Sequence, residues 1–392
     1  MVRGLVLALT VATAVAPQCG PGSTTPGTSL QNFQTITVNA GPSGDYLNGA
    51  FTSVTICVPG QSSSCQTISG VLIDTGSSGV RVLSSALTLP LPQQNDASGS
   101  PLVECAQFLD GFTWGPVQTA DVKLAGEQAN AVPIQVIGTP AFPTIPTACS
   151  NTGDAEDTLS ALGANGILGI ASFKQDCGPA CVGIGASNPG FYYACPSSGC
   201  RTTAVPLQNQ VQNPVPFFAS DNNGTVIQLP SVAPGGVVST SGMLIFGIGT
   251  QANNALGPAR VLTLDAAGNF STNYGGIVYQ STYVDSGTNG IFFLDSRTTG
   301  LPLCTASTDF YCPRTLQSQS ATNRGVNGAT SAVTFSVGNV DALSARIAAA
   351  SEVAGPNPGG FAWGMSFFYG RSVFTAIEGQ ATSGGTGPYV AY

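Results

Sequence analysis

Two short segments, one in each half of the chain, share one pattern: an apolar run that ends in Asp-Thr/Ser-Gly-Ser/Thr. The first spans 71–80 around Asp74, and the second spans 282–291 around Asp285. Apolar runs predict buried strands, and Asp, Ser and Gly favour turns, so each segment predicts a strand that enters an acidic turn. A duplicated acidic turn lets one chain bring two carboxyl groups face to face. Such a pair shares one proton, because two close negative charges do not form easily.

A second signal follows each acidic turn in the same order. Ile167-Leu168-Gly169 comes after the first turn, and Ala362-Trp363-Gly364 comes after the second. Two halves with the same ordered signals predict two related lobes, which we place at residues 33–215 and 216–392. Within the first lobe, residues 173–201 form a cysteine-rich insertion.

The composition favours short strands over long helices. The chain of 392 residues has 50 Gly and 27 Pro, and only 8% of its residues are charged. These values are typical of many short strands joined by turns, so we expect an all-β protein. Only two segments, 155–162 and 340–353, carry helix signals, and both are short.

Several functional classes are excluded by the residues that the chain lacks. It has no histidine, which excludes Ser-His-Asp and Cys-His catalysis and every histidine-dependent metal site. Its cysteines form no Cys-x-x-Cys pair, so we expect neither a metal site nor a cofactor. The 11 Lys and Arg residues are scattered and the net charge is −8, which argues against nucleic-acid binding.

The first residues have the pattern of an export signal. Arg3 precedes a run of small and apolar residues, 4–16, which is too short to span a bilayer and is typical of a signal peptide. We therefore expect residues 1–19 to be a signal and 20–32 to be a flexible tether. Lipid attached to Cys19 is an open alternative to simple secretion, and it would be the chain's only link to a membrane.

The cysteines predict disulfides once Cys19 is set aside, because ten remain and an even number in an exported protein favours pairing. Close spacing predicts two local bridges, Cys57–Cys65 and Cys304–Cys312. Four more cysteines are expected to pair among themselves in an order left open, and one pair then remains: Cys177, Cys181, Cys195 and Cys200 form the group, and Cys105 and Cys149 form the pair.

Taken in order along the chain, these motifs resemble those of the pepsin-like aspartic peptidases. The resemblance rests on five segments and covers about residues 33–392: Asp74-Thr-Gly-Ser-Ser, Gly166-Ile-Leu-Gly, Leu244-Ile-Phe-Gly, Asp285-Ser-Gly-Thr and the tail Phe368-Tyr-Gly-Arg-Ser-Val-Phe374. Within that family the chain looks most similar to a group of exported bacterial proteins. The resemblance implies a bilobal β fold, with barrel- or sandwich-like lobes and a long cleft between them.

The resemblance also implies roles for the acidic turns. Asp74 and Asp285 would be the catalytic pair, and a water molecule activated between them would attack a peptide bond. Four residues would support the two carboxylates: Gly76, Ser77, Gly287 and Thr288. The expected partner is a peptide or protein substrate, and the protein would act as a monomer.

The chain departs from the family pattern near the expected flap, the hairpin that covers the cleft in pepsin-like enzymes. The matching stretch, Glu104 to Asp121, lacks the family's tyrosine. Three aromatic residues of this stretch could cap the site instead: Phe108, Phe112 and Trp114. Arg81 stands where the family has a tryptophan that braces the flap.

Two functions from different classes follow from these observations. The first is an exported aspartic endopeptidase, located outside the cell, in the periplasm or on the outer surface, and most active at acidic to mildly acidic pH. The second is an inactive pepsin-like protein that binds peptide or glycan at the surface. Both carboxylates and both supporting hydroxyls are present, which favours the enzyme.

Overall fold

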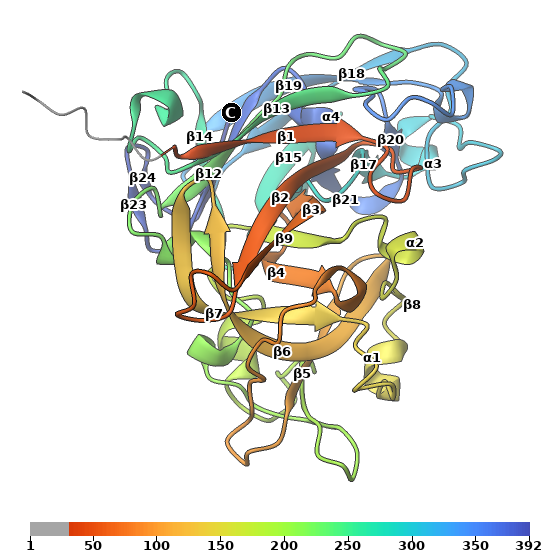
Figure 1. Ribbon diagram of the computed structural model, residues 1–392. Helices are drawn as coiled ribbons and strands as arrows, with labels where there is room; N and C mark the ends of the chain where they lie inside the picture. The colour runs from red at the N-terminus through yellow and green to blue at the C-terminus, as the bar shows by residue number, and fades with distance from the viewer. Residues whose placement is uncertain (1–30) are drawn as a thin grey trace, which may run out of the picture. The chain divides into compact units, whose positions relative to one another are not determined.

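The computed structural model describes residues 31–392, so the predicted signal at 1–19 and most of the predicted tether lie outside it (Figure 1). The first part of the described chain contains strands β1 (Phe33–Asn39), β2 (Gly49–Cys57), β3 (Cys65–Asp74), β4 (Ser78–Leu83), β5 (Leu102–Gln107), β6 (Gly111–Leu124), β7 (Glu127–Ile137), β8 (Asp154–Ala155), β9 (Gly166–Ile170), β10 (Tyr192–Ala194) and β11 (Arg201–Thr202).

Strands also dominate the second part of the chain, which confirms the predicted all-β class. They are β12 (Gly224–Gln228), β13 (Thr240–Phe246), β14 (Val261–Thr263), β15 (Phe270–Tyr274), β16 (Ile277–Val284), β17 (Ile291–Leu294), β18 (Gln317–Arg324), β19 (Thr330–Val337), β20 (Ala354–Gly355), β21 (Asn357–Trp363), β22 (Ser372–Ala376), β23 (Ala381–Thr382), β24 (Gly385–Thr386) and β25 (Tyr389–Ala391).

The α-helices of the described residues are single turns: α1 (Thr147–Ser150), α2 (Leu159–Leu162), α3 (Ser296–Thr299) and α4 (Met365–Phe368). Over residues 31–392 we find no helix with the length and hydrophobicity that a membrane crossing requires.

A single hydrogen-bonded sheet joins strands from both parts of the chain. It runs β11-β10-β5-β6-β7-β4-β9-β3-β2-β1-β13-β12-β22-β25-β14. The connection is the antiparallel pair β1–β13, in which Phe33 faces Ile245 and Val38 faces Thr240 (Figure 1). A second sheet runs β19-β18-β15-β16-β21-β17-β20, and β23 pairs with β24.

The two acidic turns lie in matching strand frames. β3 enters the first turn and pairs in parallel with β9, while β4 leaves the turn and pairs with the other edge of β9. β16 and β17 flank β21 in the same way around the second turn. The frame is therefore repeated, as the duplicated motif predicted, whereas the boundary between lobes at 215/216 stays a prediction.

Backing glycines explain why each turn can lie so close to its neighbouring strand. A Cβ atom added at Gly169 would lie 2.8 Å from the carbonyl oxygen of Ser77. Gly364 is packed in the same way against the backbone of Thr288 and Gly290. Because glycine alone lacks a Cβ atom, only glycine fits at position 169 behind the first turn and at position 364 behind the second.

The predicted helices are mostly wrong. Residues 155–162 form a helix only at Leu159–Leu162, which Thr158 caps by accepting from the Ala161 N–H. Of 340–353, only Val340–Ala342 form a 3₁₀ turn. The alanine run 348–350 is extended instead, because its backbone bonds Val237 and Asn48, which replaces the hydrogen bonds that a helix would make.

The disulfides agree with the sequence-based pairing. Cys57–Cys65, Cys304–Cys312 and Cys105–Cys149 are all bridged as predicted. The group of four left open resolves into Cys177–Cys181 and Cys195–Cys200. Five disulfides are compatible with an exported protein.

Candidate active site

Each acidic turn holds its own carboxylate with two hydrogen bonds of the same kind. The Gly76 N–H donates to Asp74 Oδ1 at 2.7 Å, and the Ser77 hydroxyl donates to Asp74 Oδ2. In the second turn the Gly287 N–H donates to Asp285 Oδ1 at 2.8 Å. The Thr288 hydroxyl donates to Asp285 Oδ2 at 2.6 Å. All four residues predicted to support the carboxylates therefore contact them.

The two carboxyl groups also meet each other. The charge of Asp74 and its hydrogen bonding with Asp285 raise the pKa of Asp285, so the pair favours a state with one proton. The fit is reciprocal at the glycines: a Cβ atom added at Gly76 would lie 2.6 Å from the Cγ of Asp285. One added at Gly287 would lie 2.7 Å from the Oδ1 of Asp74. Each turn therefore accommodates the opposite carboxyl group only because glycine follows its middle residue.

A second set of bonds locks the turns together, and the sequence analysis did not single out its residues. The Ser286 N–H donates to Thr75 Oγ1 at 2.9 Å, and the Thr75 N–H donates to Ser286 Oγ at 3.1 Å. The Ser286 hydroxyl in turn donates to the carbonyl of Ile73 at 2.8 Å. The available signal was the hydroxyl residue in the middle of each Asp-Thr/Ser-Gly triplet.

Burial and charge shape the titration of this pair. The pKa of Asp285 is raised to about 8 by burial first, and then by the charge of Asp74 and the hydrogen bond that the two groups share. The bonds from Thr288 and Gly287 oppose this rise. The pair therefore retains one proton well above the pH at which an ordinary aspartate loses it.

Both turns line a cavity of about 1090 Å³. The apolar part of its wall includes Leu72, Phe173 and Phe292, whereas Asp110 and Glu156 add two further carboxyl groups. No Lys or Arg occurs among the described residues that line this cavity. The site is therefore an open acidic cleft that the cysteine-rich insertion does not fill.

The β5–β6 hairpin occupies the stretch predicted as the flap. Its tip, residues 108–110, lines the cleft, so Phe108 lies where a capping residue was expected. Phe112 and Trp114 do not line it. Both are buried around the Cys105–Cys149 bridge, and Trp114 packs edge-on against Tyr193 at 5.3 Å. Phe112 and Trp114 are two positions apart in β6, so their side chains lie on the same, buried face of the strand. The prediction that they line the cleft is therefore wrong.

A tyrosine from another element reaches the cleft, and sequence reasoning missed it. Tyr46 belongs to the loop between β1 and β2, lines the cavity and packs edge-on against Phe51. Burial first, and then the charge of Asp110, raise its pKa, so its hydroxyl stays protonated. No local pattern marks Tyr46, because only the folding of its loop brings it to the cavity.

The fold defined by these elements is the bilobal, pepsin-like all-β fold. The crystal structure of aspartic proteinase from Irpex lacteus is similar, with a TM-score of 0.52 and 16% sequence identity. The match covers 92% of this chain and 96% of that chain, so the likeness extends over both lobes and shows the fold.

The chain belongs to the family described as "Protein of unknown function (DUF3443)", which matches residues 28–392. No curated protein sequence matches the chain.

Proposed function

We propose that the protein is an exported aspartic endopeptidase in which Asp74 and Asp285 activate water. One observation carries this proposal: two repeated turns bring the carboxyl groups of Asp74 and Asp285 together in the wall of one open cleft. A purely structural pair of turns would gain nothing from placing two carboxyl groups together, because their proximity disfavours ionisation of both. The pepsin-like fold supports the proposal without establishing it.

The mechanism begins with one carboxylate and one protonated carboxyl group, and a water molecule between them. The carboxylate takes a proton from the water as the water oxygen bonds to the carbonyl carbon of the peptide. The protonated group gives its proton to the carbonyl oxygen, which forms a neutral tetrahedral intermediate. The newly protonated carboxyl group then gives its proton to the amide nitrogen, and the other carboxylate takes a proton from a hydroxyl of the intermediate as the C–N bond breaks. A carboxylic acid and an amine leave, and the pair again holds one proton.

The turn hydrogen bonds fit the needs of this mechanism. The outer oxygens accept from Ser77 and Thr288, so the remaining lone pairs of the carboxyl groups face each other and the cleft. The crossed bonds of Thr75 and Ser286 keep the two turns in register. Such preorganisation makes rearrangement during the reaction unnecessary.

Export, and a peptide or protein as the substrate, are parts of the same proposal. Five disulfides and the signal-like first residues support export. The similarity of the motifs to those of exported bacterial pepsin-like proteins supports it as well. Lipid on Cys19 would add a membrane anchor without changing the chemistry of the cleft.

One observation favours the second function, a binding protein without activity. The β5–β6 hairpin offers Phe108 at its tip and no phenolic hydroxyl. If capping by a hydroxyl of the hairpin is essential to the reaction, the cleft would bind peptides and leave them intact. The structure retains the open cleft that both functions need.

A library of mixed peptides, incubated between about pH 3 and 7 with and without pepstatin, separates the two functions. The proposal predicts cleavage that pepstatin suppresses and that Asp74→Asn or Asp285→Asn abolishes. Peptide binding without cleavage by the folded wild type would instead establish the binding protein. Circular dichroism of each variant serves as the control for folding.

A further inference from the structure

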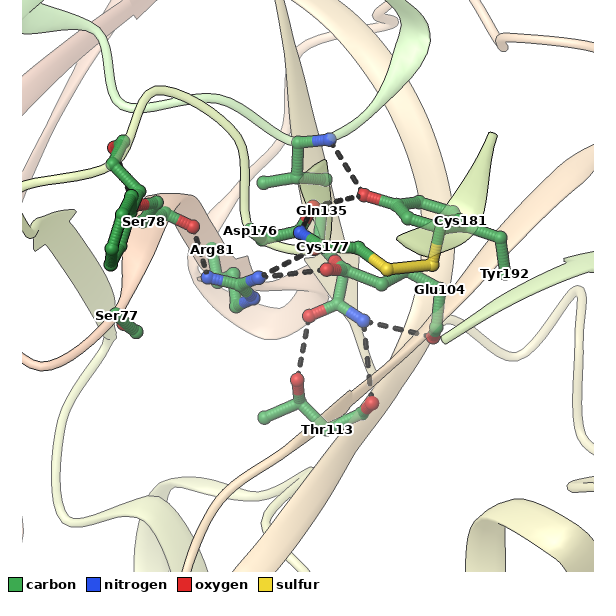
Figure 2. Close-up of polar contacts among 12 residues, drawn as sticks. Ser77, Ser78, Arg81, Glu104, Thr113, Gln135, Asp176, Cys177, Cys181 and Tyr192 are labelled. Atoms are coloured by element: carbon green, nitrogen blue, oxygen red, sulfur yellow. Dashed lines mark hydrogen bonds and ion pairs between the residues drawn. A yellow bond between two sulfur atoms is a disulfide. The ribbon is translucent and has the colours of Figure 1, made fainter. Parts of the chain in front are cut away.

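A buried ionic cluster lies beside the first acidic turn, and the mechanism above does not use it (Figure 2). Arg81 of β4 is 2% exposed, and its Nη2 donates to Glu104 Oε1 at 2.7 Å and to Asp176 Oδ2 at 3.2 Å. Its Nη1 donates to the carbonyl of Ser78 at 2.9 Å. The hydroxyl of Tyr192 donates to Asp176 Oδ1 at 2.6 Å.

The charges of this cluster do not balance, so burying it away from water is energetically unfavourable. One guanidinium faces two carboxyl groups, and Glu104 is fully buried. A buried negative charge without a partner is strongly unfavourable, so the cluster takes up a proton. The pKa of Asp176 is raised accordingly, by burial first and then by the charge and hydrogen bond of Glu104.

The partners of Arg81 come from three segments: the start of β4, the β5–β6 hairpin and the loop at Asp176. Ser78 directly follows Ser77, which donates to Asp74. Glu104 lies on β5, the first strand of the hairpin, and Asp176 begins the loop closed by the Cys177–Cys181 bridge (Figure 2). The guanidinium also lies over the ring of Phe108 at 5.9 Å, within the range of a cation–π contact.

We propose that Arg81 is a positioning residue, which fixes the β5–β6 hairpin and its tip residue Phe108 in the wall of the cleft that Asp74 also lines. Glu104 and Asp176 orient the guanidinium, and the bond to Ser78 ties it to the first acidic turn. Phe108 then covers substrate bound in the cleft at a distance set by Arg81. This inference rests on the proposed peptidase function for its substrate, although the placement of the hairpin is measurable without any reaction.

The experiment compares hydrogen exchange of the hairpin amides, residues 104–112, with the kinetics of peptide hydrolysis. Arg81→Lys keeps the charge but loses the fork that reaches three partners. Phe108→Leu removes the ring at the hairpin tip and leaves the buried cluster intact. We expect each variant to speed hairpin exchange at least tenfold and to raise KM about tenfold, with a smaller change in kcat.

The double variant tests whether the two residues act as one unit. If Arg81 acts through Phe108, the combination should cost little more than either change alone, whereas independent effects would multiply. Phe108→Tyr keeps the ring and should therefore leave hairpin exchange at the wild-type rate. Arg371→Lys is the matched control. The Arg371 guanidinium lies 4.6 Å from the centre of the Phe367 ring, and neither residue lines the cleft, so this change should leave hairpin exchange unchanged.

The outcomes separate the two proposals. Unchanged hairpin exchange in folded Arg81→Lys and Phe108→Leu, or fully multiplicative effects on KM, would overturn the positioning role while leaving the peptidase intact. Faster hairpin exchange in both variants of a protein that cleaves no peptide would support the positioning role and refute the peptidase. Should Arg81→Lys fail to fold, exchange and KM of Phe108→Leu still decide the question.

Discussion

The two acidic turns hold their carboxylates with the same bonds but lie in different surroundings. Arg81 of β4 faces Ile167 in β9, and Phe292 of β17 faces Ala362 in β21, so the two residues occupy equivalent places in the repeated frame. At this place the first half has a buried ionic cluster, whereas the second has a phenylalanine that lines the cleft.

The other face of each frame is apolar in both halves but differs in its side chains. In the second half aromatic rings stack there, with Phe293 5.4 Å from Phe361 and Phe361 5.5 Å from Trp363. In the first half the equivalent residues carry no ring: they are Val82, Gly166 and Leu168. The comparison teaches that the repeated frame dictates the geometry of the two carboxylates. It does not dictate the residue next to each turn, which is a charged arginine in the first half and an apolar phenylalanine in the second.

The equivalence of the turns is tested most severely at their glycines. We expect Gly76→Ala and Gly287→Ala each to lower kcat/KM by at least about a thousandfold, because the new Cβ atom would displace the opposite carboxyl group. Steady-state hydrolysis of one peptide measures the effect. Gly183→Ala is the control, since a Cβ atom there meets nothing within 4 Å. A tenfold or smaller loss at either turn would contradict the reciprocal fit.

The pH dependence tests the asymmetry of the pair. Because the pKa of Asp285 is raised to about 8, the shared proton is present below that pH and is lost above it. We therefore expect kcat to persist beyond the acidic range that the sequence predicted, up to about pH 8, and to fall about tenfold per unit above it. A profile measured from pH 3 to 10 checks this. A kcat that is independent of pH up to 10 would show that no shared proton takes part.

The free energy of unfolding, like kcat, should fall as the pH rises. A raised pKa in the folded state stabilises the fold at low pH, and this contribution is lost as pH rises from about 4 to 8. Asp285→Asn removes the ionisable group, so at pH 8 it should stabilise the protein by several kcal/mol relative to wild type and have little effect at pH 3. Urea unfolding at both pH values provides the comparison, and equal differences at the two would be inconsistent with the raised pKa.

The hydroxyls outside the carboxylates should matter less than the glycines. Ser77→Ala and Thr288→Ala each remove one hydrogen bond to a carboxylate, so we expect about a tenfold loss of kcat in each. Thr288→Ala should also move the alkaline limb of the pH profile to higher pH, because the hydrogen bond from Thr288 lowers the pKa of Asp285. Thr288→Ser keeps the hydroxyl and should retain activity. An unshifted limb in Thr288→Ala would rule out this influence.

The smallest effect is expected at the acidic wall of the cleft, which the first half supplies through Asp110 and Glu156. Burial, and then the charge of Asp110 and its hydrogen bond, raise the pKa of Glu156 to about 7. Wild type should therefore prefer lysine-containing peptides about threefold above pH 7, and the preference should vanish at pH 5. Competition between paired peptides measures it. Glu156→Gln should remove the preference above pH 7 and change nothing at pH 5, and a preference that survives above pH 7 would contradict the role of Glu156.

Sequence reasoning succeeded where a local pattern dictates the structure. The apolar runs before Asp74 and Asp285 and the glycines after them specify a strand and a turn almost unaided. Cysteines such as Cys57 and Cys65 lie close in sequence, so their pairing needed no long-range information.

It failed where distant contacts decide. The alanine run 348–350 has helical propensity, yet Asn48 and Val237 bind its backbone as an extended segment. Trp114 looked available to the cleft until the Cys105–Cys149 bridge and its cluster enclosed it. Tyr46 and the partners of Arg81 were invisible for the same reason, since only the tertiary fold brings them together.

The most direct test of the shared-proton pair is a cycle of Asp74→Asn, Asp285→Asn and the double variant, measured on one cleavable peptide. Groups that act as one unit lose their effect together. Each single variant should therefore lower kcat by at least about a thousandfold, and the double variant should lower it no further. A single variant that keeps a tenth of the wild-type rate, or losses that multiply in the double variant, would contradict catalysis by this pair.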